Sequence, residues 1–425
     1  MEIREGYKKT EVGVIPQEWK VFYLNEACER ISVGLATSVT KYYRESGVPI
    51  IRNLNIKDGY FDSRDMLFLE PEFAKQNLTK AANAYDVLTV HTGSNLGLTC
   101  VLPPEFKNSQ TFTTLITTPQ KNKLDSFFLC YHMSSSMGKA EMQRLQVGGG
   151  KGNLNTGDLK KYCFAIPPTI AEQQAIATAL SDMDGLISSL TKLIDKKKNI
   201  KQGAMQMLLS GKKRLDGFSG EINYVSLKST CSAFCDGDWI ESKDQSDNGY
   251  RLIQTGNVGI GKYLDKSEKK RYISEDTFTR LKCTEIYKED VLVSRLPEPA
   301  GRACIVPESK EPMITAVDCT IIRFGQNYNA VLFVNYTQTP EYQKQIDMML
   351  GGSTRQRISR KELGQVVVPV FPSEEEQTAI ANILSDMDNE IETLEQKQNK
   401  YIAIKQGMMQ ELLTGRIRLV EEVMQ

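Results

Sequence analysis

Two long stretches of the chain place apolar residues alternately three and four positions apart, which is the spacing of a helix with a narrow apolar seam. The seam residues are Leu180, Met183, Ile187, Leu190 and Ile194 in the first stretch, and Leu384, Met387, Ile391 and Leu394 in the second. The pattern predicts two coiled-coil helices of about 40 residues, each about 60 Å long if unbroken. A helix of this length cannot bury its seam against itself, so we expect the two helices to pair in antiparallel orientation.

The two helical stretches are copies of one sequence. Adding 204 to each position of Pro168–Leu215 reaches Pro372–Leu419 without a gap, and roughly half of the residues are identical. For example, "IKQGAMQMLLSGKKRL" in the first copy becomes "IKQGMMQELLTGRIRL" in the second. Such internal self-similarity determines the architecture and indicates a pseudo-two-fold repeat.

Each copy carries its own helix signals. A Ser or Thr followed three residues later by Glu opens the copies at Thr169–Glu172 and Ser373–Glu376, and this spacing predicts a capping box. Gly211 and Gly415 stand where a left-handed residue would end each helix. We therefore expect both helices to begin and end at matching positions.

The segments before the two helices are related more faintly. Ala84–Pro103 aligns with Lys288–Pro307 at the same offset, with an Asp, a Gly, a Cys and a Pro kept in place. Short strand-like runs are expected at Val87–Val90, Val291–Val293 and Gln365–Val370, and a short helix at Lys121–Ser136.

The fold class that follows is a pair of α/β (α+β) globules joined by two long antiparallel coiled-coil helices. The expected boundaries are 1–165 for the first globule, 166–215 for the first helix, 216–369 for the second globule and 370–425 for the second helix. Two divergent globules on a duplicated rigid frame suit the reading of two different DNA half-sites at a fixed separation.

Composition narrows the class of protein further. The chain of 425 residues has a formal net charge of zero, which argues against a DNA-binding protein that works alone, but not against one whose partners share the DNA contacts. No apolar run approaches a membrane span, and the N-terminus lacks an apolar leader, so we expect a cytoplasmic protein without membrane contact. Its nine cysteines are expected to be reduced and mostly buried.

Several motifs together resemble the specificity subunit of type I restriction–modification systems. They are "YKKTEVGVIPQEWKVFYL" at Tyr7–Leu24, the two "IAxxLSDMD" stretches and the two "IKQGxMQxLL" endings, and the resemblance covers essentially the whole chain. It implies that each globule is a target-recognition domain and each helix a spacer. It further implies a non-catalytic subunit that reads a bipartite, asymmetric sequence in double-stranded DNA. The implied partners are two methyltransferase subunits and restriction–translocase subunits, and methyl donor, ATP and Mg²⁺ are expected on those partners only.

The residues themselves give no support for catalysis. His91 and His132 are the only histidines, and neither belongs to a metal-binding spacing. "GNVGIGKY" at Gly256–Tyr263 matches the start of a phosphate-binding loop, but Tyr263 stands where Mg²⁺ coordination needs Ser or Thr. We expect a turn there. An enzyme and a pure protein scaffold remain the alternatives, and a scaffold would gain little from divergent twin globules.

Candidate DNA contacts follow from side-chain chemistry, because base edges are read by Arg, Lys, Asn, Gln, Ser and Thr on exposed loops. In the first globule the candidates are Arg52, Asn53, Asn55, His91, Ser94, Asn95, Lys151 and Asn153. In the second they are Gln254, Thr255, Asn257, Arg295, Arg302, Thr354, Arg355 and Arg357. The alternative for each is an ordinary solvated side chain.

Partner subunits are expected to dock on the outward faces of the long helices, where long amide side chains can bridge helices. The candidates are Gln173, Gln174, Gln202, Gln206, Gln377, Gln406 and Gln410. Glutamine is also simply a good helix former, which is the alternative for each position.

Overall fold

The structure is a computed structural model that describes residues 4–146, 152–352 and 356–419. It divides into two compact units. Unit 1 consists of residues 1–190 and 397–425, and unit 2 of residues 191–396. These units differ from the domains expected from sequence, because each contains one globule, the first half of one long helix and the second half of the other.

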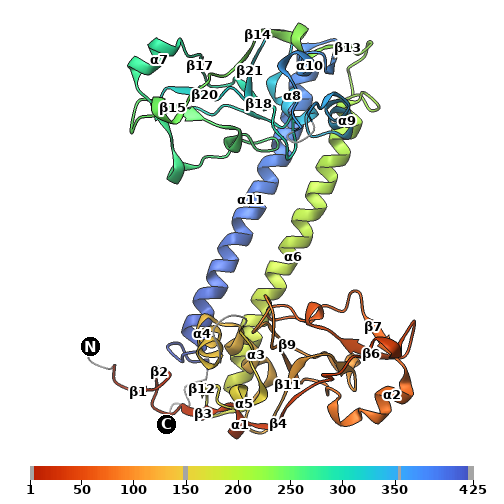
Figure 1. Cartoon of the computed structure of the whole chain (residues 1–425), viewed down its shortest axis with the longest axis vertical. Coiled ribbons are helices and arrows are strands. Elements are labelled where there is room, and N and C mark those ends of the chain that lie inside the picture. Colours follow the sequence, from red (N-terminus) through yellow and green to blue (C-terminus); the bar gives the residue numbers. More distant parts are fainter. Residues whose placement is uncertain (1–3, 147–151, 353–355, 420–425) are drawn as a thin grey trace. The chain divides into compact units, whose positions relative to one another are not determined.

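Unit 1 contains two four-stranded sheets, in the orders β4-β11-β8-β9 and β10-β6-β7-β5, and the two pairs β1-β2 and β12-β3 (Figure 1). The strands are β1 Tyr7–Thr10, β2 Gly13–Pro16, β3 Lys20–Tyr23, β4 Cys28–Val33, β5 Tyr43–Arg44, β6 Val48–Ile51, β7 Leu67–Leu69, β8 Val87–Val90, β9 Thr99–Val101, β10 Gln110–Thr111, β11 Thr114–Pro119 and β12 Cys163–Ile166. The short helices are α1 Leu24–Ala27, α2 Pro71–Gln76, α3 Ser126–Ser134, α4 Ser136–Leu145 and α5 Thr156–Leu159.

Unit 2 repeats this plan with the sheets β14-β21-β18-β19 and β16-β15-β20-β17 and the pair β13-β22. Its strands are β13 Asn223–Ser226, β14 Cys231–Asp236, β15 Tyr250–Ile253, β16 Tyr272–Ile273, β17 Glu285–Ile286, β18 Val291–Ser294, β19 Ala303–Ile305, β20 Met313–Thr315, β21 Cys319–Phe324 and β22 Val367–Val370. Its short helices are α7 Glu275–Leu281, α8 Ala330–Tyr336, α9 Pro340–Met349 and α10 Arg360–Leu363.

The predicted strands are confirmed, except that the one expected at Gln365–Val370 begins only at Val367, and the predicted helix at Lys121–Ser136 also needs correction. The helix α3 begins only at Ser126, because the Asp125 carboxylate accepts a hydrogen bond from the Phe128 amide at 2.9 Å and caps it. A break at Ser135, which caps α4 in turn, ends α3. The polar residues before Asp125 therefore form a turn.

The two long helices are α6, Ile170–Leu209, and α11, Glu374–Leu412, of 40 and 39 residues. Their ends pack into the cores of the globules. In unit 1, Leu180 of α6 and Leu412 of α11 share one apolar cluster with the fully buried Trp19. In unit 2, the counterparts Leu208 and Leu384 share the apolar cluster of that unit. Apolar residues of the long helices therefore pack into the cores of the globules as well as between the two helices.

Within each unit the two helix halves run antiparallel, as predicted, and their ion pairs explain why the sequence is repeated. In unit 1, Lys405 Nζ lies 2.6 Å from an Asp184 carboxylate oxygen. In unit 2, Lys201 Nζ lies 2.6 and 2.7 Å from the two carboxylate oxygens of Asp388. The aspartate of "SDMD" in one copy thus pairs with the lysine of "IKQG" in the other. Each pair takes one motif from each copy, so keeping both pairs requires both motifs in both copies.

Of the two hydrogen bonds expected in each capping box at the starts of α6 and α11, one is present and the other is not. The hydroxyls of Thr169 and Ser373 accept the predicted hydrogen bonds from the amides three residues on, at 3.2 and 3.1 Å. The glutamates of the expected capping boxes bind arginines instead. Arg418 donates to both carboxylate oxygens of Glu172, and Arg214 donates to both of Glu376. Each buried carboxylate therefore ties the start of one helix to the segment after the other.

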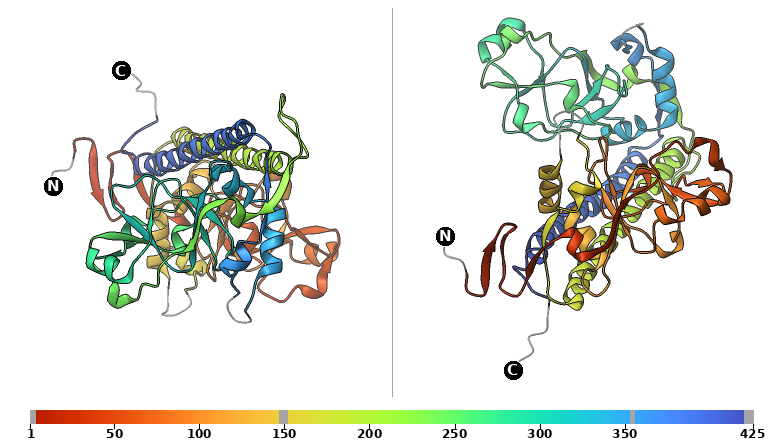
Figure 2. Two further views of the ribbon diagram at one scale, coloured as in Figure 1. Left: turned by 90° about the horizontal axis from the view of Figure 1, so that it is seen from above. Right: turned by 60° about the horizontal axis from the view of Figure 1, so that its bottom comes forward.

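The predicted left-handed caps are confirmed, with φ of +69° at Gly211 and +70° at Gly415. Beside the second cap, the Tyr7 hydroxyl donates to the Gly415 carbonyl at 3.1 Å, so the β1–β2 hairpin lies against the end of α11 (Figure 2). All nine cysteines are free thiols, and seven of them are buried, as expected. Among the described residues, no helix has both the length and the apolar character needed to cross a membrane.

Candidate nucleic-acid interface

One end of the sheet β4-β11-β8-β9 gathers the loops that carry the candidate DNA contacts of unit 1. The antiparallel register pairs Val33 with Leu115, Val90 with Thr114 and Thr89 with Thr99. The end of β4, the start of β11, the end of β8 and the start of β9 therefore lie at the same end of the sheet. The loops that leave this end include residues 34–38 and 91–98.

Two further loops are fastened to this end of the sheet. The Gly59 amide, in the loop after β6, donates to the Thr99 carbonyl at 2.9 Å. The Leu154 amide, just before α5, donates to the His91 carbonyl at 3.0 Å. Segments distant in sequence thus meet on one surface, and sequence reasoning alone had only assigned them to separate loops.

Unit 2 reproduces these connections between equivalent residues. The Gly261 amide donates to the Ala303 carbonyl at 3.0 Å, and the Ile358 amide donates to the Arg295 carbonyl at 3.2 Å. The loop between β18 and β19 is closed by the bond from the Gly301 amide to the Ser294 carbonyl at 2.8 Å. The backbone frame is therefore shared by the two units, and the side chains mounted on it differ.

The structure leaves some predicted residues accessible on this surface. Ser94, Asn95, Asn153 and Arg357 are exposed. Five others are half-buried, namely Arg52, Asn53, His91, Gln254 and Thr255. In unit 1, His91 Nδ1 lies 3.2 Å from the Asn153 side-chain oxygen, so two predicted residues from different loops meet.

Two predicted residues hold their own loops together. Asn55 is fully buried, accepts from the Arg52 amide at 3.0 Å and donates to two carbonyls of the same loop. Its equivalent Asn257 is 8 % exposed, accepts from the Gln254 amide at 3.0 Å and donates to the Leu264 carbonyl at 2.9 Å. Their amide groups are satisfied internally. The expectation of base contacts was therefore wrong for these two positions, where a tight turn needs the side chain itself.

Arg302 is likewise an internal connector. Its guanidinium donates to five backbone carbonyls in two loops, those of Val258, Thr255, Leu296, Pro297 and Pro299, at 2.7 to 3.1 Å. Burial lowers the pKa of Arg302 below its ordinary value. All three nitrogens of Arg302 donate to backbone carbonyls, so it joins loops, and a base contact would require it to leave these partners, which corrects the prediction.

Arg295 is also largely buried, with 7 % exposure. It donates to the Val317 carbonyl at 2.6 Å, and its Nε lies 3.5 Å from an Asp236 carboxylate oxygen. It thus fixes the loops at the sheet end, and the predicted base contact would require it to leave these partners. The predicted residues Lys151, Thr354 and Arg355 lie outside the described residues.

The segment Gly256–Tyr263, which resembles the start of a phosphate-binding loop, forms a tight turn, as expected. Val258 and Tyr263 form an isolated bridge, and the Gly259 amide donates to the Lys262 carbonyl at 3.0 Å.

Burial lowers the pKa of His132 to about 4, and its Nδ1 lies 2.8 Å from the Tyr162 hydroxyl. Within the described residues, no group of three or more His, Cys, Asp or Glu side chains could hold a metal ion.

Two of the predicted partner-binding glutamines do not face outward. Gln173 is 1 % exposed and binds the Asp125 amide at 2.8 Å and the Lys123 carbonyl at 3.0 Å. Gln377 is 2 % exposed and binds the Asn329 amide and the Asn327 carbonyl, each at 3.0 Å. Each amide group joins the start of a long helix to the loop before α3 or α8. Their burial leaves them no surface for a partner.

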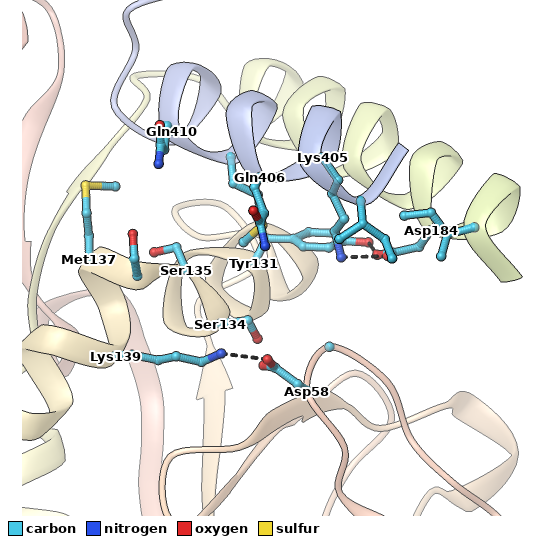
Figure 3. A pocket seen from close by; sticks show the side chains of 15 residues that line it. Asp58, Tyr131, Ser134, Ser135, Met137, Lys139, Asp184, Lys405, Gln406 and Gln410 are labelled. Carbon is cyan, nitrogen blue, oxygen red and sulfur yellow. Dashed lines mark hydrogen bonds and ion pairs between the residues drawn. The ribbon is translucent and has the colours of Figure 1, made fainter. Parts of the chain in front are cut away.

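The other predicted glutamines remain accessible: Gln174, Gln406 and Gln410 are exposed, and Gln202 and Gln206 are half-buried. In unit 1, Gln406 and Gln410 line a cavity of about 610 Å³ between α11 and the α3–α4 corner (Figure 3). The same cavity is bordered by the ion pair of Lys139 with Asp58, at 2.6 Å. It thus lies beside the loop after β6, which is fastened to the sheet end that carries the candidate DNA contacts of unit 1.

Sequence reasoning missed the loops after β4 and β14, which leave the same sheet end. A signal for them existed in the glycines that follow the two strands. A Cβ at Gly34 would lie 2.4 Å from the Thr111 carbonyl oxygen, and one at Gly237 would lie 2.3 Å from that of Thr315. Both positions therefore require glycine, which marks a close approach of two backbone segments.

Comparison with known proteins bears on this duplicated surface. A family model described as the type I restriction modification DNA specificity domain matches residues 16–202 and 221–402. The two matches together cover most of the chain, one in each half. The chain belongs to this family.

Relatives with the family's architecture match nearly the whole chain. Two proteins of Methanocaldococcus jannaschii are named as the MjaX and MjaVIII type I restriction enzyme specificity subunits, the first provisionally. They are 25 % and 24 % identical to this chain over 98 % of its length, and over 97 % and 96 % of their own.

A solved structure of the type I restriction–modification S subunit from M. genitalium shares the fold. It has a TM-score of 0.60 at 15 % identity and covers 97 % of this chain and 98 % of its own. The predicted family and fold class are therefore confirmed. The comparisons do not test the predicted contact residues, and those that the structure leaves accessible stay predictions.

Proposed function

We propose that the chain is the DNA sequence-specificity subunit of a type I restriction–modification complex. Each globule is then a recognition domain that reads one half of a bipartite, asymmetric site, and the long helices set the spacing of the halves. The proposed role is recognition and not catalysis. Because the proposed ligand is DNA, the proposed compartment is the cytoplasm.

One observation carries this proposal: the two units share a backbone frame at the sheet end and differ in the side chains mounted on it. His91 and Arg295 accept the same backbone bond, yet one is an imidazole and the other a guanidinium. Asn153 in the first unit stands where Arg357 stands in the second. A reader of two different half-sites needs this combination, since hydrogen-bonding side chains specify bases.

The proposed DNA contacts are the accessible residues of this surface. They are Arg52, Asn53, His91, Ser94, Asn95 and Asn153 in unit 1, and Gln254, Thr255 and Arg357 in unit 2. The proposed partners are two methyltransferase subunits and, for cleavage, restriction–translocase subunits. Methyl donor, ATP and Mg²⁺ are assigned to those partners, because the family resemblance describes a subunit that recognises DNA without catalysing.

Methylation mapping tests the proposal directly. A host would express the neighbouring methyltransferase with and without this chain, and its genome would be mapped by single-molecule sequencing. We expect a split, asymmetric motif only when the chain is present. Substituting Arg357 by Ala should then relax one half of the motif, and substituting Asn153 by Ala the other half. A soluble complex that adds no motif would favour the protein-scaffold alternative.

Partner docking is tested by placing large charged side chains on the exposed glutamines. Arginine at Gln406 and Gln410 together should abolish co-purification of the methyltransferase while leaving the fold intact. Arginine at Gln174 tests the start of the other helix. Unchanged co-purification for the paired variant would remove this helix face from the proposed interface. A buried-position control, Gln173→Arg, should instead destabilise unit 1.

A further inference from the structure

The chain contains two tryptophans in opposite environments. Trp19 is fully buried in unit 1, whereas Trp239 in unit 2 is 71 % exposed. A single exposed apolar side chain is common on protein surfaces and indicates nothing by itself. The position of Trp239 and the rigidity of its loop make it informative.

Trp239 lies in the loop after β14, at the sheet end that gathers the candidate DNA loops of unit 2. The register pairs Asp236, the last residue of β14, with Thr320, and Ser294, the last residue of β18, with Cys319. The two strands therefore end side by side on β21. The loop with Trp239 is thus a neighbour of the loop that begins at Arg295.

The backbone that carries Trp239 is held from three sides through Asp238. Its amide donates to the Thr315 carbonyl at 2.8 Å, and its carbonyl accepts from the Val317 amide at 2.9 Å. Its carboxylate accepts from the Thr284 amide at 2.8 Å. Because this backbone is already held, binding through Trp239 does not have to order the loop, which lowers the entropic cost of contact.

The indole itself leaves its apolar faces free. Its Nε1 donates to a Glu241 carboxylate oxygen at 3.3 Å, which satisfies its one polar group. In the same loop region, Arg360, half of whose side chain is exposed, lies 3.8 Å from Asp236, three residues before Trp239. Exposed aromatic faces and exposed arginines are both groups through which proteins contact nucleic acid.

The equivalent loop of unit 1, residues 34–38, carries no aromatic side chain. This loop makes the same isolated bridge, Leu35 with Phe112, that Asp238 makes with Ala316 in unit 2. Ala36 therefore occupies the place of Trp239 on an otherwise similar backbone. The aromatic group is a difference between the two recognition surfaces, which is where half-site specificity must lie.

We propose that Trp239 is a specificity-determining residue of unit 2, whose indole packs against the DNA of the half-site that this unit reads. The inference rests on the proposed function and names a contact within it. Aromatic side chains that stack on bases or fill a groove supply apolar contact that differs between base sequences.

The test uses the full chain in complex with its methyltransferase subunit and a duplex carrying the motif found by methylation mapping. Subtracting the emission of the W239F complex removes the signals of Trp19 and of any partner tryptophan. We expect the remaining Trp239 emission to be quenched by the motif duplex. A duplex with only the half-site of unit 2 scrambled should not quench it.

Affinity gives an independent readout. The change W239A should raise the Kd for the motif duplex by about 5- to 150-fold, the range for loss of one base–aromatic contact. It should leave thermal unfolding unchanged, because the side chain is exposed. Y287A is the matched control: Tyr287 is 53 % exposed and precedes β18 at the opposite end of the same sheet. It should leave the Kd unchanged.

The outcomes separate the inference from the function on which it rests. Motif binding with unaltered Trp239 emission and an unaltered Kd for W239A would overturn the inference alone. Quenching by the methyltransferase without DNA would also overturn it and place Trp239 at a protein interface. A chain that directs no methylation motif would overturn both the proposed function and this inference.

Discussion

Removing the arginine that holds a buried glutamate should destabilise unit 1 strongly. The Glu172 side chain has no exposed surface, and Arg418, 24 % exposed, donates to both of its carboxylate oxygens. Arg418 also donates twice to Glu18 at 3.2 Å, beside the buried Trp19. The change Arg418→Met leaves the Glu172 charge without its ionic partner in a site from which water is excluded.

The magnitude follows from the cost of an uncompensated buried charge. Breaking a buried ion pair by removing one partner costs about 3 to 5 kcal/mol. Because water reaches part of Arg418, we expect the lower end, about 3 kcal/mol. For a unit of this size that lowers the Tm by about 6 to 12 °C. Arg416→Met is the matched control, since Arg416 is 63 % exposed and its bond to Glu411 is 3.4 Å long. It should cost less than about 1 kcal/mol.

The assay follows unfolding of unit 1 by Trp19 fluorescence in the W239F background, where Trp19 is the remaining tryptophan. Adding Glu172→Gln to Arg418→Met should recover at least about 1 kcal/mol of unfolding free energy, because it removes the buried carboxylate charge that has lost its partner. If Arg418→Met and Arg416→Met have equal unfolding free energies, or if Glu172→Gln gives no recovery, the carboxylate is not held as described.

Three other outcomes are expected. Arg302→Lys should destabilise unit 2 by about 2 to 3 kcal/mol in urea unfolding, because the lysine ammonium cannot reach all five carbonyls. Arg357→Ala should change the stability by less than about 0.5 kcal/mol and should weaken DNA binding. Burial lowers the pKa of His132 to about 4, so the unfolded chain, with a pKa near 6.5, binds the proton first as pH falls. Stability present above pH 6.5 should decline by about 2 kcal/mol at pH 5, and a His132→Phe variant should lack this part of the pH dependence of unfolding. Gly415→Ala should cost at least about 1 kcal/mol in thermal unfolding, since its φ is +70° and a Cβ would lie 2.5 Å from Pro16, while Gly407→Ala, in open space within α11, should stabilise.

Much of the fold could be predicted from the sequence because its signals are local and occur twice. The 3-4 spacing, the caps at Thr169 and Ser373 and the glycines at the helix ends determined α6 and α11. The 204-residue offset determined that the chain contains two related halves. What the pattern did not reveal is that the ends of the seam also enter the cores of the globules.

The candidate site could be predicted only in outline. Side-chain chemistry selects Asn55, Arg302 and Arg357 alike, because each has donors that suit a base edge. Only the folded chain shows that Asn55 and Arg302 donate these hydrogen bonds to nearby backbone carbonyls, whereas Arg357 is exposed. Hydrogen-bonding capacity is a property of the residue, but its availability depends on neighbours brought together from distant segments.

The sequence by itself thus determined the repeat, the two long helices and the family. Tertiary structure decided how the copies use each other: Asp184 pairs with Lys405, Asp388 with Lys201, and Glu172 and Glu376 with arginines that follow the other copy's helix. A capping box and a cross-helix ion pair need the same glutamate at the same position. Local spacing cannot distinguish them, because the competing arginine lies more than 160 residues away in the chain.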